Sequence, residues 1–204
     1  MLSKIWGELY ISLPLAIEEA NELLNHAIDI DKSIQELLLR DKAAPPLGKV
    51  ITANILIGLS IEIFLKCFML AGRDEGIKMG HKLLDLYKVF PDFLKKEIEN
   101  RYKVIFNNNS TMQEFALIIS QTTPDNPNKN IPESPDFKDF VTSLNVLSNI
   151  FVDSRYFFEK INDDNWSIIG YYFESAKSIA IALKLVLDDY MAGKFKGNAK
   201  SSSY

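Results

Sequence analysis

The chain has little of the two residue types that most often build disulfides and metal sites. Its 204 residues include one cysteine, Cys67, and two histidines, His26 and His81. A single cysteine excludes an internal disulfide framework and a cysteine-based zinc site. The two histidines lie far apart with no carboxylate at ligand spacing, so we expect no metal site and no cofactor. Cys67 lies in an apolar run, where we expect an inert core thiol.

Several motifs of catalysis and nucleotide binding are also missing. The nine glycines are scattered, and neither a GxxxxGK[ST] phosphate loop nor a GxSxG nucleophile elbow is present. The net charge of −4 argues against binding of nucleic acid across the whole protein surface. The first twenty residues carry Glu8, Glu18 and Glu19, which export signals lack. We therefore expect a cytoplasmic protein.

What is present is a succession of helical patterns. Apolar residues recur at helical spacing in segments 13–40, 46–71, 81–90, 93–106, 111–120, 136–151 and 165–191. No alternating strand pattern, internal repeat or heptad seam is visible. The prediction is an all-α fold, a single helical bundle over residues 1–193. We expect a proline-rich mobile loop at 121–135 and a disordered tail at 194–204. The alternative, a domain boundary at this loop, leaves only two main helices after it.

The segment from Ala53 to Ala71 is apolar nearly all round, which indicates a buried helix. It is nearly long enough to cross a membrane, but Glu62 and Lys66 near its centre oppose insertion. Residues 54, 58, 62 and 66 are spaced by four, so they form one polar line along the helix. This line has two interpretations: a structural ion pair at the edge of the bundle, or the wall of a functional site.

Two later segments supply candidate partners for this polar line. His81 follows a turn and begins a predicted helix, where it can act as a general base, bind an anion or cap the helix. Arg155 and Tyr156 lie among aromatic residues, and an arginine held near a core reaches a carboxylate or a phosphate. For Arg155 we consider Glu62 as an internal partner and Asp153 or Glu159 as local ones. We expect Glu62, Lys66, His81, Arg155 and Tyr156 to converge on one concave ligand-binding site.

The order of these segments resembles the HEPN superfamily. The resemblance consists of S-I-E-I-F-L-K at 60–66, G-H-K-L-L-D-L at 80–86, and R-Y at 155–156 before the last long helix. It implies an all-helical, often dimeric domain that is linked to nucleotide handling or RNA cleavage in bacterial defence and toxin–antitoxin systems. A small nucleotidyltransferase is a candidate partner protein in that context.

The chain departs from the superfamily at its ribonuclease motif. RNA-cleaving members carry an Arg-x4-6-His motif near the last helix, whereas the positions after Arg155 hold Lys160, Ile161 and Asn162. The leading hypothesis is therefore a HEPN-like binding or interaction module with a polar pocket for a nucleotide-like or RNA ligand. One alternative is an atypical ribonuclease or nucleotide-modifying enzyme that uses His81 and Arg155. Another is a purely structural subunit of a complex.

We also expect a symmetric homodimer and no association with a membrane. The dimer follows from the resemblance and from the last helix, which is apolar on more than one side. The apolar residues in question are Ile168, Ile169, Tyr172, Phe173, Ile179, Ala180, Leu183 and Leu187.

Overall fold

The computed structural model describes residues 4–6, 9–41, 45–72, 80–109, 115–119, 136–156 and 167–195. These ranges contain six helices: α1 (Leu13–Asp41), α2 (Leu47–Gly72), α3 (Leu83–Lys88), α4 (Asp92–Asn109), α5 (Phe140–Arg155) and α7 (Phe173–Met191). Strands are few and short in these ranges. The prediction of an all-α helical bundle is therefore confirmed.

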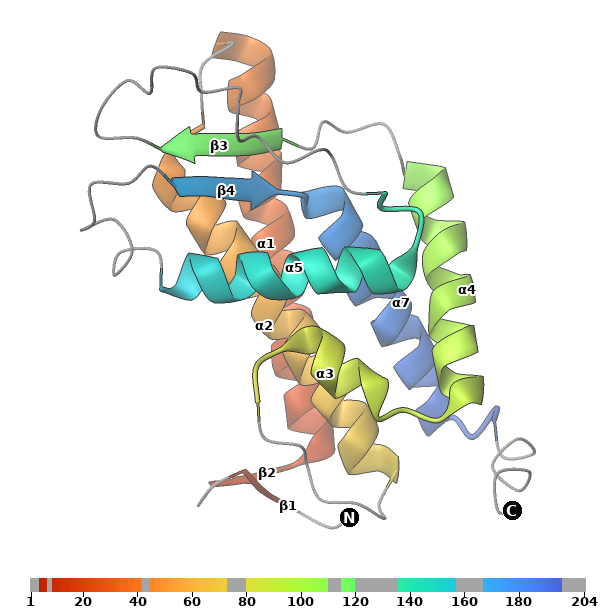
Figure 1. The fold of residues 1–204 in the computed structure, drawn as a ribbon. Coiled ribbons are helices and arrows are strands. Elements are labelled where there is room, and N and C mark those ends of the chain that lie inside the picture. The colour runs from red at the N-terminus through yellow and green to blue at the C-terminus, as the bar shows by residue number, and fades with distance from the viewer. Residues whose placement is uncertain are drawn as a thin grey trace.

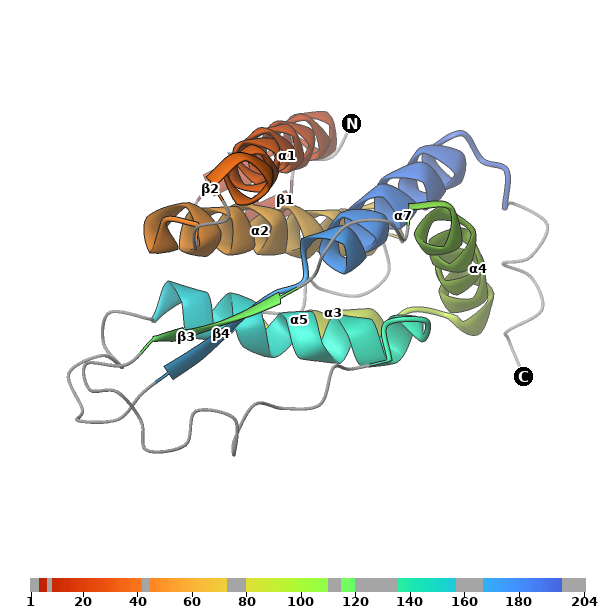
Figure 2. The same ribbon diagram turned by 90° about the horizontal axis from the view of Figure 1, so that it is seen from above.

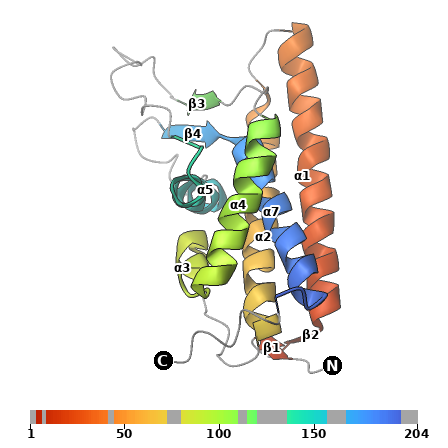
Figure 3. The same cartoon turned by 90° about the vertical axis from the view of Figure 1, so that its right-hand side faces the viewer.

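Helix α2 occupies the centre of the bundle. Figure 1 shows α1, α2, α4 and α7 running lengthwise, with α3 and α5 lying across them. Seen from above, α2 lies between α1 on one side and α5 on the other (Figure 2). The side view places α3 and α5 on one side of the long helices and α1 on the opposite side (Figure 3). Helices α1, α7, α5 and α3 all pack on α2.

The apolar character of α2 follows from this central position. Its side chains, including Ile57, Ile61, Phe64 and Leu65, belong to one cluster of buried residues that draws on every described helix. By length and composition α2 could cross a membrane, and 56% of its most apolar window is buried inside the fold. That burial is typical of the core helix of a globular bundle.

Helix α7 is covered within the chain on the sides that we expected to need a partner. Phe173, Ile179, Ala180, Leu183 and Leu187 are all buried in the single chain. Helices α2 and α4 supply most of this cover. The expectation that these residues of the last helix need cover from a second copy is therefore wrong, and they give no argument for a dimer.

Two expected helical segments form strands instead. Strand β3 (Phe115–Ile119) lies inside the predicted helix 111–120, and β4 (Ser167–Tyr171) replaces the start of the predicted helix 165–191. They pair antiparallel with Phe115 opposite Tyr171. Short apolar runs of this kind carry no clear period, and their pairing is long-range, so local spacing could not reveal them. A second small antiparallel pair, β1 (Lys4–Trp6) and β2 (Leu9–Ile11), was also not predicted.

The other boundaries differ from prediction only at helix ends. Helix α4 continues through Asn107–Asn109, where we expected a break, and α5 continues to Arg155. The predicted mobile loop at 121–135 lies outside the described residues, as does most of the predicted tail. The described part of that tail is Lys194 and Phe195, and Phe195 packs against Phe93 with ring centroids 6.3 Å apart.

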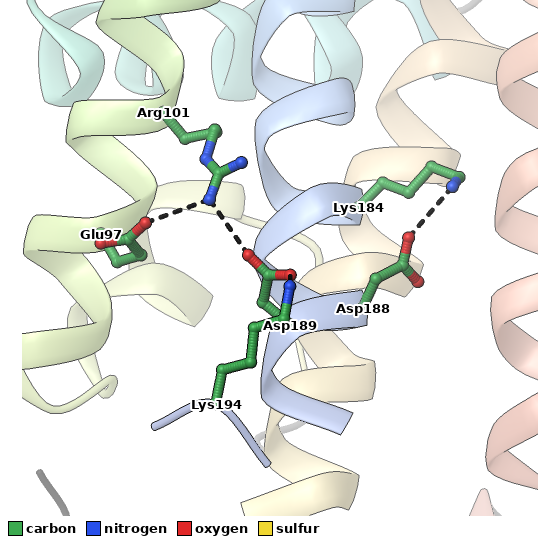
Figure 4. Close-up of polar contacts among 6 residues, drawn as sticks. All are labelled: Glu97, Arg101, Lys184, Asp188, Asp189 and Lys194. Atoms are coloured by element: carbon green, nitrogen blue, oxygen red, sulfur yellow. Dashed lines mark hydrogen bonds and ion pairs between the residues drawn. The ribbon is translucent and has the colours of Figure 1, made fainter. Parts of the chain in front are cut away.

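Ion pairs connect α4 to the end of α7 (Figure 4). Asp189 accepts from Arg101 Nη2 at 3.0 Å and from Lys194 Nζ at 2.6 Å. Arg101 also lies 3.3 Å from Glu97. The hydrogen bond from Lys194 is the main cause that holds the pKa of Asp189 below its usual range. Because these groups lie near the surface, the pairs orient the two helices more than they stabilise them.

Candidate functional site

The first half of the polar line on α2 is used to seat other elements. Asn54 is buried, and its Nδ2 donates to the carbonyl oxygen of Gly170 in β4 at 3.1 Å and to Ser154 Oγ in α5 at 3.4 Å. A buried amide needs such partners, because an unsatisfied polar group costs free energy. Asn54 therefore joins α2, β4 and α5, and it is not exposed to a ligand.

Gly58 is the place where α5 crosses α2. A Cβ atom built on Gly58 would lie 2.6 Å from Phe151 Cγ, which is closer than real contacts allow. Phe151 is 1% exposed, so its ring fills the space that the glycine leaves. The absence of a side chain at Gly58 thus admits a neighbouring helix rather than a ligand.

The second half of the line is a buried charge cluster formed by Glu62, Lys66 and His81. Lys66 Nζ donates to Glu62 Oε1 at 2.6 Å, and these two side chains are only 6% and 5% exposed. His81 Nδ1 lies 3.0 Å from Oε1 and 3.1 Å from Oε2 of the same carboxylate. The structure therefore brings together three of the five predicted site residues, although His81 comes 19 positions after Glu62.

The backbone around His81 is held from two sides. Gly80, immediately before it, has φ of +147°, a region that favours glycine. Two residues after it, the backbone N–H of Leu83 donates to Ser148 Oγ in α5 at 3.1 Å. This bond satisfies one of the free N–H groups at the start of α3. Helix α5 thus fixes the position at which His81 meets Glu62.

The contact with Glu62 determines which ring nitrogen of His81 carries a proton. An ionised carboxylate can only accept hydrogen bonds, so Nδ1 must donate. The other ring nitrogen, Nε2, is directed away from Glu62. The His81 side chain is 56% exposed, whereas Glu62 and Lys66 are buried. Nε2 is therefore the end of this cluster that solvent or a ligand can reach.

Arg155 and Tyr156 do not join the cluster in the way we predicted. We expected Arg155 near the core, with Glu62 as an internal partner and Asp153 or Glu159 as local alternatives, but Arg155 is exposed at the last position of α5. Its Cζ lies 5.4 Å from the centroid of the Phe151 ring. Tyr156 is 43% exposed. The correction has a physical reason, because Lys66, one helical turn from Glu62 on the same helix, already supplies a buried cation.

Arg155 still lies on the face of α5 that is directed toward the start of α3. Residues seven apart lie on one face of a helix, and Arg155 is seven positions after Ser148. The helical rise places it about 10 Å along α5 from the Ser148–Leu83 contact. Figure 1 shows this end of α5 on the same side of the bundle as the start of α3. Arg155 and the exposed Lys82 are thus both on this side of the bundle.

Sequence reasoning missed the serines that position the cluster. Ser148 and Ser154 are buried and contact Leu83 and Asn54. A signal was available, because Ser148 follows Phe140 and Leu144 at intervals of four and so lies on the apolar face of the predicted helix. A serine on such a face needs a hydrogen-bond partner from another element.

A second buried carboxylate has no exposed end. Asp31 is 3% exposed and accepts from Tyr171 Oη at 2.9 Å and from Gln35 Nε2 at 3.1 Å. Burial, followed by the charge of Asp31, raises the pKa of Tyr171. Both side chains are internal, so this contact holds β4 on α1 and offers nothing to a ligand.

Other potential sites in the described residues carry none of the predicted site residues. A cavity of about 570 Å³ lies at the end of α1 and the start of α2, lined by Ser33, Glu36, Leu37, Leu39, Arg40 and Lys49. Lys49 is roughly 20 Å along α2 from Glu62. Within the described ranges no three His, Cys, Asp or Glu side chains are grouped to hold a metal ion.

Comparison of the chain with protein-family models, curated proteins and solved structures finds no match.

Proposed function

We propose that this chain is a HEPN-like helical binding module of the cytoplasm, and that His81 binds a phosphate group of a nucleotide-like or RNA ligand. One observation supports the proposal above others: a buried ion pair ends in a single exposed imidazole. The exposed imidazole gives this buried pair an end that a ligand can contact. The bacterial defence or toxin–antitoxin context, with a nucleotidyltransferase-like partner, follows from the resemblance alone.

The charges around His81 support an anionic ligand. The negative charge of Glu62 is balanced by Lys66 at 2.6 Å, so the cluster does not repel an anion through its carboxylate. Among the described residues, the exposed side chain that follows His81 directly in the sequence is the cationic Lys82. Because Nδ1 donates to Glu62, His81 can donate to a phosphate oxygen only as an imidazolium, with Nε2 protonated as well. Ammonium and guanidinium groups donate charge-assisted hydrogen bonds to phosphate oxygens in the same way.

Equilibrium binding of fluorescently labelled single-stranded RNA and of nucleotides tests this function. We expect His81→Ala to weaken binding about tenfold or more, because a hydrogen bond to a charged group is worth roughly 1.5–3 kcal/mol. The matched control is His26→Ala, since His26 is exposed on α1 and lies outside the cluster. Equal affinity of both variants for every probe would contradict the proposal.

A second candidate function is an atypical ribonuclease or nucleotide-modifying enzyme. The observation that favours it is the Nδ1 contact with Glu62, which orients the ring and leaves Nε2 available for proton transfer. Incubation with mixed RNA and with nucleotides then gives products with the wild type and none with His81→Ala. Glu62→Gln should lower the rate, because an amide no longer stabilises a charged imidazole. If the wild-type protein leaves RNA and nucleotides unchanged, the enzyme function is contradicted. Two proposals then stay open, the binding module and the structural subunit of a complex.

A further inference from the structure

The contact between His81 and Glu62 limits what the exposed end of the cluster can donate. A neutral imidazole carries one proton, and Nδ1 holds that proton against Oε1 of Glu62 at 3.0 Å. In this form Nε2 can only accept a hydrogen bond, and it becomes a donor only when the ring takes up a second proton. A hydrogen bond between Nε2 and a phosphate oxygen therefore needs one proton more than a neutral ring and a fully ionised phosphate contain together.

Phosphate groups differ in whether they can bring this proton themselves. A phosphate monoester has a second pKa of about 6, so near neutral pH it exists both with and without a proton on a terminal oxygen. It can meet His81 as a dianion that accepts from the imidazolium, or as a monoanion that donates to neutral Nε2. A phosphodiester inside a nucleic-acid chain keeps its single negative charge near neutral pH and depends on the imidazolium alone.

The elements that meet at His81 carry charges of both signs. Helices α2, α3 and α5 pack on one another, and α2 contributes the ion pair of Glu62 with Lys66. The charged residues at α3 and in the last turn of α5 are Lys82, Asp85, Lys88, Asp153 and Arg155. Proteins that follow a nucleic-acid backbone do so with a groove of continuous positive charge. Carboxylates placed between the cations, in a chain of net charge −4, suit one terminal phosphate better.

We propose that the ligand presents a terminal phosphate monoester to Nε2 of His81, and that the complex holds one proton between Nε2 and a phosphate oxygen. This inference rests on the proposed phosphate binding by His81, and it adds the ligand class and the pH dependence. The complex binds one proton more than its ionised partners, so low pH favours the complex. Affinity therefore falls as pH rises above the range in which histidine and the monoester take up protons.

Adenosine 5′-monophosphate and adenosine 3′,5′-cyclic monophosphate test the ligand class as a matched pair. They share base and sugar, and only the first carries a monoester. Calorimetric titration of the intact chain at pH 7 should show binding of the monoester that is at least about tenfold tighter, the effect of one hydrogen bond to a charged group. Equal affinities would overturn the ligand class and leave phosphate binding by His81 intact. Absence of binding by these probes and by RNA would contradict both.

Proton uptake tests the shared proton in the wild-type protein. Titration with adenosine 5′-monophosphate at pH 7.5, in two buffers of different ionisation enthalpy, should show a net uptake of protons. Between pH 7 and pH 8.5 the affinity should fall by up to about tenfold per pH unit. His81→Arg is the control, because its guanidinium stays charged over this range, and its affinity should change little with pH. Wild-type binding without proton uptake, or the same pH dependence in His81→Arg, would overturn the shared proton.

Discussion

At the scale of single residues, Glu62 contacts two nitrogen-bearing side chains of different exposure. Its carboxylate accepts from buried Lys66 at 2.6 Å and from the half-exposed His81 at 3.0 Å. Taking a charge out of water is costly unless a partner compensates. Lys66 supplies that compensation inside the bundle, and this leaves His81 available for other contacts.

Removing Lys66 should therefore leave the buried carboxylate of Glu62 without its buried cation and destabilise the fold. We expect Lys66→Met to lower the free energy of unfolding by about 3–5 kcal/mol, the usual effect of leaving one buried charge unpaired. The double variant Glu62→Leu/Lys66→Met removes both charges and should recover much of this loss. Urea unfolding measures both. A Lys66→Met variant as stable as the wild type would show that His81 alone satisfies Glu62.

At the scale of secondary-structure elements, α5 is the part that assembles the site. It contacts Gly58 through Phe151, Asn54 through Ser154, and the start of α3 through Ser148. Its orientation across α2 therefore determines where His81 lies. Two predictions test this role of α5, one at its crossing with α2 and one at its N-terminus.

Gly58→Ala should destabilise the fold although alanine is the better helix former. The new Cβ would lie 2.6 Å from Phe151 Cγ, and forcing extra volume into a packed core typically costs about 1–3 kcal/mol. Gly48→Ala in the same helix is the matched control, because nothing lies within 4 Å of its Cβ. The free energy of unfolding of this control variant should instead rise by up to about 1 kcal/mol. Thermal or urea unfolding separates the two, and equal effects would argue against the close crossing.

Asp139 caps the N-terminus of α5, and its effect should depend on pH. Its Oδ2 accepts from Thr142 N at 2.7 Å, and this backbone hydrogen bond is the main cause that lowers the pKa of Asp139 below 3.8. A lowered carboxyl pKa gives stability that is present above the unfolded value and is lost as pH falls through the folded value. Replacing such a cap by alanine costs about 0.5–2 kcal/mol.

The measurement is urea unfolding of wild type, Asp139→Ala and Asp139→Asn between pH 7 and pH 3. Asparagine keeps the capping oxygen without a titrating group. The advantage of the wild type over Asp139→Asn should shrink below about pH 4, where aspartate side chains take up a proton. An advantage that stays constant over this range would contradict a charged cap.

At the scale of the whole molecule, the helical bundle could be predicted from the sequence because its signal is local. The apolar spacing predicted α1 and α2, and the even apolar character of α2 predicted its burial. The pairing of β3 with β4 could not be predicted in this way, because it joins segments that are far apart in the sequence. The return of His81 to the polar line of α2 was predicted, because His81 follows the turn that leaves this helix, but its direct contact with Glu62 was not. The exposure of Arg155 was not predicted, because it depends on how α5 packs on distant segments.

The burial of Cys67 gives a probe of the whole fold. Its side chain is fully buried in α2, and burial raises the pKa of its thiol to about 12. Because the thiolate is the reactive form, a thiol reagent should label the native protein only as fast as the core opens. Labelling with a chromogenic disulfide in rising urea measures this, with fully unfolded chain as the control. Native-state labelling at the rate of the unfolded chain would show that α2 is not at the centre of a stable core.

The most direct test of the proposed function is nuclear magnetic resonance of the two histidine rings, His26 and His81. In free protein we expect the long-range nitrogen–proton spectrum to show His81 protonated at Nδ1, as its contact with Glu62 requires. Addition of ATP or single-stranded RNA should shift the Nε2 signal of His81 to saturation and leave His26 unchanged. A His81 signal that does not respond to any nucleotide or RNA, or that responds no more than His26, would contradict a phosphate site at this cluster.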